Sequence, residues 1–127
     1  MATVEEPLAL AEAMRKNSHA DTLVVVDCLT LWLTNLRMPA DQANFEQNRP
    51  LTPVDKAYAA SLLIAIVQAT GPVVLVGNEI GLGVIPMGSE VRAFVDALGR
   101  LNQDVAAACQ RVTLMAAGLP LTLKDSV

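Results

Sequence analysis

Residues 22–27 read Thr22-Leu-Val-Val-Val-Asp27, an apolar run that ends in a carboxylate. The run does not alternate between apolar and polar residues, which is typical of a strand covered on both faces in a parallel sheet. A second run of the same kind is Val73-Val-Leu-Val76. Buried strands that alternate with helices predict an α/β architecture.

Helical patterns surround the two strands. The first predicted helix lies within residues 1–17, and the others cover residues 29–36, 53–68 and about 90–109. Pro7 suits the first turn of the first helix, and Thr52 followed by proline marks the start of the third. The segment 62–67 is apolar all round, so we expect it to be deeply buried. Ser89 is the expected N-cap of the last helix.

Loops and further strands complete a single α/β domain over residues 1–127. Residues 38–52 are polar, contain two prolines and predict a loop. Strands are expected at 112–116 and 119–123, with Gly118 in the turn between them. A doubly wound sheet normally opens with a strand whose following turn holds phosphates. These residues open with a helix instead.

Composition narrows the class of protein. The chain is 53% hydrophobic and 17% charged, with a net charge of −4. This is too apolar for disorder, and slightly too apolar for so small a domain, which predicts buried strands or a partner that covers them. An acidic chain with 3% aromatic residues and no basic stripe argues against nucleic-acid binding. No apolar run reaches the roughly 18 residues of a membrane span, and acids stand where a secretory signal carries bases, so we expect a soluble cytoplasmic protein.

Cysteine and histidine offer little chemistry here. Cys28 and Cys109 lie far apart in apolar segments, so we expect buried free thiols in a reducing compartment. One histidine and no ligand cluster make a zinc site implausible. His19 lies in a polar connection and is expected to be a surface residue.

Carboxylates follow both predicted strands. Asp27 ends the first, and Asn78 and Glu79 follow the second. In open parallel sheets ligands bind beyond the carboxyl ends of the strands. Asp27 is either an acid that holds Mg²⁺ beside phosphates or a cap on the following helix. Glu79 is either a site residue or a solvated loop acid.

The loop Asn78-Glu-Ile-Gly-Leu-Gly-Val-Ile-Pro86 carries two glycines, Gly81 and Gly83. Glycine permits close approach of the backbone to a ligand or a positive φ, so a tight turn and a ligand loop are equally compatible with it. Pro86 takes the position of the third glycine of a dinucleotide-binding motif. No GxxxxGK[ST] phosphate loop occurs in the sequence.

Several of these segments resemble one family, the bifunctional adenosylcobinamide kinase/adenosylcobinamide-phosphate guanylyltransferases of cobalamin biosynthesis. The matching stretches are Val25-Val-Asp-Cys-Leu-Thr-Leu-Trp-Leu-Thr-Asn-Leu36, Val74-Leu-Val-Gly-Asn-Glu-Ile-Gly-Leu-Gly-Val-Ile-Pro86, Gly99-Arg-Leu-Asn-Gln103, Ala117-Gly-Leu-Pro-Leu-Thr-Leu-Lys124 and Thr3-Val-Glu-Glu-Pro7. They cover nearly the whole chain and occur in the family's order.

The resemblance implies a P-loop NTPase fold of the RecA-like type, with a mostly parallel sheet and a C-terminal β-hairpin. It implies phosphorylation of adenosylcobinamide by ATP or GTP, followed by transfer of GMP from GTP, by way of a histidine, to give adenosylcobinamide-GDP. By position, Glu5 and Asp27 match residues that contact the guanine nucleotide, Asp27 also being the acid on the Mg²⁺ side. The loop with Asn78, Glu79, Gly81 and Gly83 matches a signature loop near the site. Family members form homo-oligomers, typically trimers.

The chain also departs from the family pattern. The family's N-terminal strand, its phosphate loop and its nucleophilic histidine precede the motif at Thr3, so we expect this chain to be the C-terminal two-thirds of a family member. His19 lies too late to take the histidine's role. Without these groups the chain alone is expected to be inactive. The alternatives are a non-catalytic nucleotide- or corrinoid-binding or assembly subunit, and an unrelated α/β domain.

Overall fold

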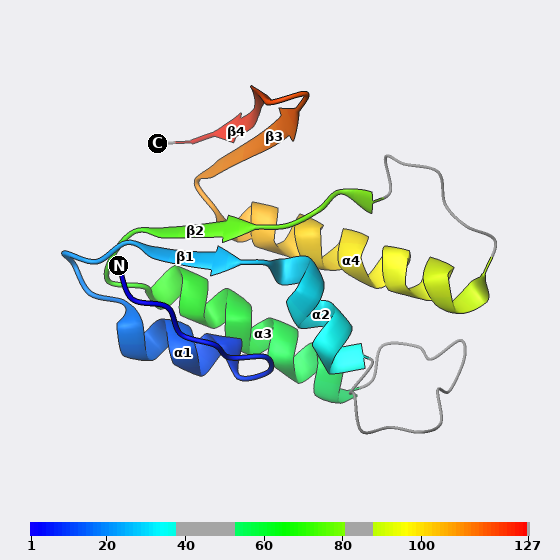
Figure 1. The fold of residues 1–127 in the computed structure, drawn as a ribbon, viewed down its shortest axis with the longest axis horizontal. Helices are drawn as coiled ribbons and strands as arrows, with labels where there is room; N and C mark the ends of the chain where they lie inside the picture. The colour runs from blue at the N-terminus through cyan, green and yellow to red at the C-terminus, as the bar shows by residue number, and fades with distance from the viewer. Residues whose placement is uncertain (38–52, 81–87, 127) are drawn as a thin grey trace.

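The computed structural model describes residues 1–37, 53–80 and 88–126 (Figure 1). Their helices and strands follow the order α1 (Leu10–Asn17), β1 (Val24–Asp27), α2 (Leu29–Arg37), α3 (Pro53–Gln68), β2 (Val73–Val76), α4 (Ser89–Ala108), β3 (Arg111–Ala116) and β4 (Leu119–Asp125). The α/β class and the order of elements are confirmed. The loop predicted over residues 38–52 lies outside the described residues.

The strands form two separate pairs. β1 and β2 are parallel, with Val24 opposite Val73 and Asp27 opposite Val76. β3 and β4 form the expected antiparallel C-terminal hairpin. Among the described residues the parallel sheet is small, with two strands, and β3 pairs only with β4.

A tight turn explains this local pairing. Ala116 pairs with Leu119, so two residues connect the strands. Ala117 and Gly118 both have positive φ, 53° and 73°. Positive φ at both central positions belongs to the type I′ turn, whose twist matches that of the flanking strands. The turn expected at Gly118 is therefore confirmed.

One cluster of buried side chains lies between the parallel pair and the helices. Val26 contributes from β1, Met14 from α1, Leu62 from α3 and Leu98 from α4. Leu62 and Leu98 are the largest fully buried side chains among the described residues. Figure 1 shows α1 and α3 running side by side beneath the two strands.

The opposite face of the parallel pair is open. Val24 and Val26 face the core cluster, while Val25 is 56% exposed, since side chains alternate along a strand. On β2, Val74 and Val76 are exposed in the same way. The prediction of strands covered on both faces is therefore wrong here: among the described residues, helices cover one face only.

Three helix predictions also need correction. α1 begins at Leu10, so Pro7 is not in its first turn. The N-cap of α4 is Gly88, and Ser89 is the first helical residue. The segment 62–67 is not buried all round, because Leu62 and Ala65 face the core while Val67 is 72% exposed. Helix α3 packs on the core with one face only, so its other face stays exposed even though its residues are apolar.

Candidate nucleotide site at the carboxyl edge of the strands

The carboxyl ends of β1 and β2 lie side by side. Asp27, the last residue of β1, is opposite Val76, the last residue of β2. Asn78 and Glu79 follow two and three residues later, so they leave the sheet at the same edge as Asp27. The sequence analysis predicted that Asp27, Asn78 and Glu79 lie at one edge of the sheet, and the parallel pairing of β1 and β2 places them there.

Asp27 has an exposed carboxylate. Helix α2 begins two residues later, and its first turn is capped by Cys28, whose Sγ accepts a hydrogen bond from the backbone N–H of Leu31 at 3.4 Å. The Cys28 carbonyl accepts from the N–H of Trp32 at 3.2 Å. Among the described residues no backbone N–H of α2 bonds to the Asp27 carboxylate. The helix-cap interpretation of Asp27 is therefore not observed.

Two polar side chains hold the start of the loop after β2. Thr30 Oγ1 on α2 accepts a hydrogen bond from the backbone N–H of Asn78 at 3.1 Å. Asn102 Nδ2 on α4 donates to the Asn78 carbonyl at 3.0 Å and reaches Glu79 Oε2 at 3.5 Å. Glu79 is exposed, and Asn102 on α4 lies at hydrogen-bond distance from its carboxylate.

Sequence reasoning did not single out Thr30 or Asn102. Both stand in stretches quoted above, Asn102 in Gly99-Arg-Leu-Asn-Gln103. The sequence signals that could have identified them are the amide of Asn102 on an amphipathic helix and the hydroxyl of Thr30 in an apolar helix. Which loop they reach depends on packing between distant segments.

The N-terminal segment packs against α2. Trp32 Nε1 donates to the Leu8 carbonyl at 2.9 Å, and Asn35 Nδ2 donates to the Pro7 carbonyl at 3.2 Å. Glu6 Oε2 accepts from the N–H of Leu8 and of Ala9 at 3.2 and 3.1 Å. These bonds orient the chain before α1, which explains why the helix begins after Pro7.

Glu5 lies at the end of this anchored segment and is exposed. In the part of the chain that the structure describes, no hydrogen bond or ion pair links Glu5 to the residues of the carboxyl edge. Gly81 and Gly83 lie outside the described residues.

The edge is acidic, which favours a cation over a bare phosphate. In the described part of the chain no group of three or more His, Cys, Asp or Glu side chains is arranged to hold a metal ion. Mg²⁺ at phosphate sites needs only one or two protein carboxylates, because water and phosphate oxygens complete its shell. Asp27 fits that role by its position and exposure.

The two cysteines and the histidine were also considered as functional residues. Cys28 and Cys109 are free, as expected, but half-buried rather than buried. Burial raises the pKa of the Cys109 thiol, and the nearby Lys124 ammonium partly offsets this effect. His19 is exposed in the connection before β1, as expected. No helix in the described ranges is long and apolar enough to cross a membrane.

Comparison with known proteins places these features in a family. The family model described as cobinamide kinase / cobinamide phosphate guanyltransferase matches residues 1–123. The chain is 43% identical over 122 residues to a bifunctional adenosylcobalamin biosynthesis protein, CobP, of Pseudomonas aeruginosa, covering 96% of this chain and 65% of that protein. It is 31% identical over 125 residues to the protein named CobU of Escherichia coli, covering 96% of this chain and 69% of that one.

A third relative, CobU of Salmonella typhimurium, is 33% identical over 119 residues, which covers 84% of this chain and 66% of that protein. The chain thus spans about two-thirds of the length of these relatives. The match over residues 1–123 includes both strands of the parallel pair, the candidate edge and the start of the hairpin. On this evidence the chain belongs to the cobinamide kinase / cobinamide phosphate guanyltransferase family.

Proposed function

We propose that this chain supplies the nucleotide-binding edge of an enzyme that phosphorylates adenosylcobinamide and then transfers GMP from GTP to the product. The reaction gives adenosylcobinamide-GDP, an intermediate of cobalamin biosynthesis. The observation that carries the proposal is the joint placement of Asp27 and Glu79 at one strand edge, with Glu79 tied to α4 by Asn102. Family membership supports the substrate class.

Each site residue has a proposed task. Asp27 would hold a Mg²⁺ ion, which would supply positive charge beside the phosphates of GTP or ATP. Glu5 binds the guanine nucleotide from the segment anchored on α2. Asn78 and Glu79 begin the loop that continues in sequence to Gly81 and Gly83, and glycine at these positions would permit close approach of the backbone to the nucleotide.

We further propose that the fold is of the P-loop NTPase, RecA-like type, and that residues 1–127 form one α/β domain corresponding to the C-terminal two-thirds of a family member. The parallel β1–β2 pair with acids at its carboxyl edge supports this type. Adenosylcobinamide and its phosphate are the proposed partners, and a homo-oligomer, a trimer by analogy with the family, is the proposed assembly.

The 127 residues by themselves are proposed to be inactive. They contain no GxxxxGK[ST] sequence, so no lysine of that motif reaches the β- and γ-phosphates. Their single histidine, His19, is exposed before β1, at the amino end of the strand and away from the carboxyl edge. Without a nucleophile, no covalent GMP intermediate forms.

Incubation with GTP labelled at the α-phosphate tests this proposal. The 127-residue chain should take up no acid-stable or base-stable label, whereas a full-length relative carried in parallel should be labelled. A labelled 127-residue chain would refute the argument that the nucleophile is missing.

Nucleotide binding is a separate measurement. Titration calorimetry with GTP and Mg²⁺ should show binding that Asp27→Asn weakens and that Asp21→Asn, a change at another exposed acid before β1, leaves unchanged. Equal binding by both variants would remove Asp27 from the proposed site.

A second candidate function is a non-catalytic binding or assembly subunit. The open apolar face of the β1–β2 pair favours it, since Val25 and Val74 need a cover. Undetectable binding of GTP and adenosylcobinamide, together with tight binding to a full-length relative, would select this function over the first.

A further inference from the structure

A cavity of about 470 Å³ lies between α2, α3 and α4. It is lined by Trp32, Leu33, Leu36, Lys56, Ala59, Ala60, Leu63, Ala97, Arg100, Leu101 and Asp104. None of the residues assigned above to the nucleotide edge is among them. Protein interiors rarely leave voids much larger than a water molecule, while small-molecule sites span roughly 300–1,000 Å³. Its volume falls within the range of small-molecule sites.

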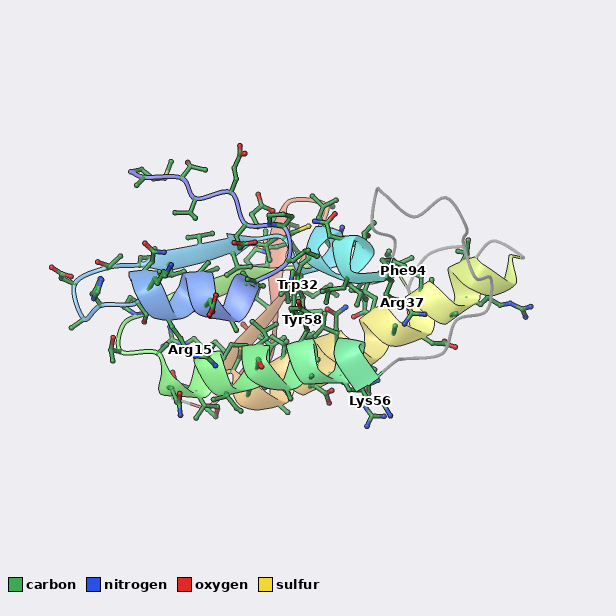
Figure 2. All side chains as sticks on the ribbon, turned by 90° about the horizontal axis from the view of Figure 1, so that it is seen from below. Arg15, Trp32, Arg37, Lys56, Tyr58 and Phe94 are labelled. Carbon is green, nitrogen blue, oxygen red and sulfur yellow. The ribbon has the colours of Figure 1, made fainter. Side chains whose placement is uncertain are left out.

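The cavity has an apolar wall fixed by a single aromatic residue. Trp32 is 5% exposed, and its indole N–H is already bonded to the Leu8 carbonyl, so the ring is held in place. Figure 2 shows Trp32 between α2 and α3. Leu63 on α3 and Leu101 on α4 add aliphatic surface. A flat apolar body would contact this wall without leaving the indole N–H unpaired.

Charged side chains complete the lining. Lys56 near the start of α3 and Arg100 on α4 both line the cavity, with Asp104 one turn after Arg100. Arg100 Nε lies 3.7 Å from Asp104 Oδ1, and the two side chains are 72% and 42% exposed, so this pair is only weakly held. The three charges sum to +1 on a chain whose net charge is −4. An anionic group at the opening would therefore meet complementary charge.

We infer that this cavity binds an amphipathic organic anion, with an aromatic or aliphatic body against Trp32 and a carboxylate, sulfonate or phosphate beside Lys56 and Arg100. The site is independent of the proposed nucleotide edge. Its occupant enters between the three helices and leaves the acidic sheet edge untouched.

The test uses the 127-residue chain and the probe 8-anilinonaphthalene-1-sulfonate, which combines an aromatic body with one sulfonate. Trp32 is the sole tryptophan, so quenching of its emission by energy transfer to the probe reports binding to the chain, and the variants below locate the bound probe. The uncharged twin N-phenyl-1-naphthylamine separates apolar contact from anion recognition.

Four variants define the expected pattern. Lys56→Gln and Arg100→Gln should each raise the Kd for the sulfonate roughly threefold and leave the Kd for the neutral twin unchanged. Ala60→Phe, which fills the cavity from an exposed helix position, should abolish saturable quenching by both probes. Lys16→Gln on α1 removes an exposed cation outside the cavity and should change nothing. Circular dichroism checks that each variant retains its helix content.

Three results would overturn the inference. The first is the absence of saturable Trp32 quenching in the unmodified chain. The second is unchanged quenching in Ala60→Phe, which would place the probe on another apolar surface. The third is an equal response of the sulfonate to Lys16→Gln and to Lys56→Gln, which would mean that general charge, not this opening, attracts the anion.

Discussion

Asn102 joins helix α4 to the loop after β2 through the Asn78 carbonyl and the Glu79 carboxylate. Replacing it with alanine leaves these two acceptors without their α4 donor. Because a typical hydrogen bond contributes about 1 kcal/mol, Asn102→Ala should lower the free energy of unfolding by about 1–2 kcal/mol. Urea denaturation followed by circular dichroism measures the change. Gln103→Ala, at the exposed neighbouring position, is the matched control and should stay within about 0.5 kcal/mol of the parent.

Cys109 makes stability depend on pH in the alkaline range. Burial, partly offset by Lys124, raises the thiol pKa above its ordinary value of 9.0, so the native state holds this proton more tightly than the unfolded chain. Its contribution to stability is therefore present below pH 9.0 and is lost as the pH rises through the raised native pKa.

The free energy of unfolding of the parent chain should accordingly fall more steeply above this pH than that of Cys109→Ser. The difference between the two urea-denaturation series isolates the thiol from the other ionisable groups, which the two proteins share. Parallel curves for the two proteins would contradict the assignment to Cys109.

At the scale of elements, the junction between α3 and β2 packs closely on the connection between α1 and β1. Ser18 Oγ accepts hydrogen bonds from the backbone N–H of Thr70 and of Gly71 at 3.1 and 3.3 Å. A Cβ at Gly71 would overlap the His19 carbonyl oxygen, a backbone atom that cannot rotate away. The two strands begin next to this junction, so it fixes their relative position.

Gly71→Ala should therefore destabilise the fold by about 2 kcal/mol or more, since backbone must shift to admit the methyl group. Gly99→Ala is the contrasting variant: nothing lies within 4 Å of its added methyl group, and alanine favours a helix interior by about 1 kcal/mol. Thermal denaturation should thus show opposite shifts for the two changes. A Gly71→Ala protein as stable as the parent would mean that this junction opens freely.

At the scale of the whole molecule, exposed aliphatic side chains line the surfaces of the strands that no other described residue covers. The large exposed ones on or beside the strands are Leu23, Val25, Val74, Val76, Met115, Leu119, Leu121 and Leu123. In the described residues the outer edges of β1 and β2 also lack a strand partner. Such surfaces and edges promote association.

We expect the isolated chain to self-associate in a concentration-dependent way, measured by sedimentation velocity. The double change Val25→Thr and Val74→Thr keeps β-favouring residues but adds hydroxyls to the open face, and should weaken the association. Val67→Thr, at an exposed position of α3 on the other layer, should have a smaller effect. A single monomeric species with a cooperative unfolding transition at high temperature would count against this expectation.

Much of the local structure could be predicted from the sequence, because local patterns decide it. Apolar runs identified both parallel strands, Pro53 marked the start of α3, and Gly118 marked the hairpin turn. Asp27 and Glu79 were expected at one edge because parallel strands place their carboxyl ends together. Each of these inferences uses residues adjacent in the chain, or one geometric rule for parallel pairs.

Only the tertiary structure decided what covers each surface and which side chains meet. An apolar run at Val74 looks the same whether its outer face is packed or open, since coverage depends on segments distant in sequence. The same holds for Asn102 reaching Glu79 and for Cys28, rather than Asp27, capping α2. The amino-acid sequence by itself determined the elements and the acidic edge. Packing between distant helices determined the open sheet face, the bonds that brace the edge and the cavity between α2, α3 and α4, because these depend on non-local contacts that no local pattern encodes.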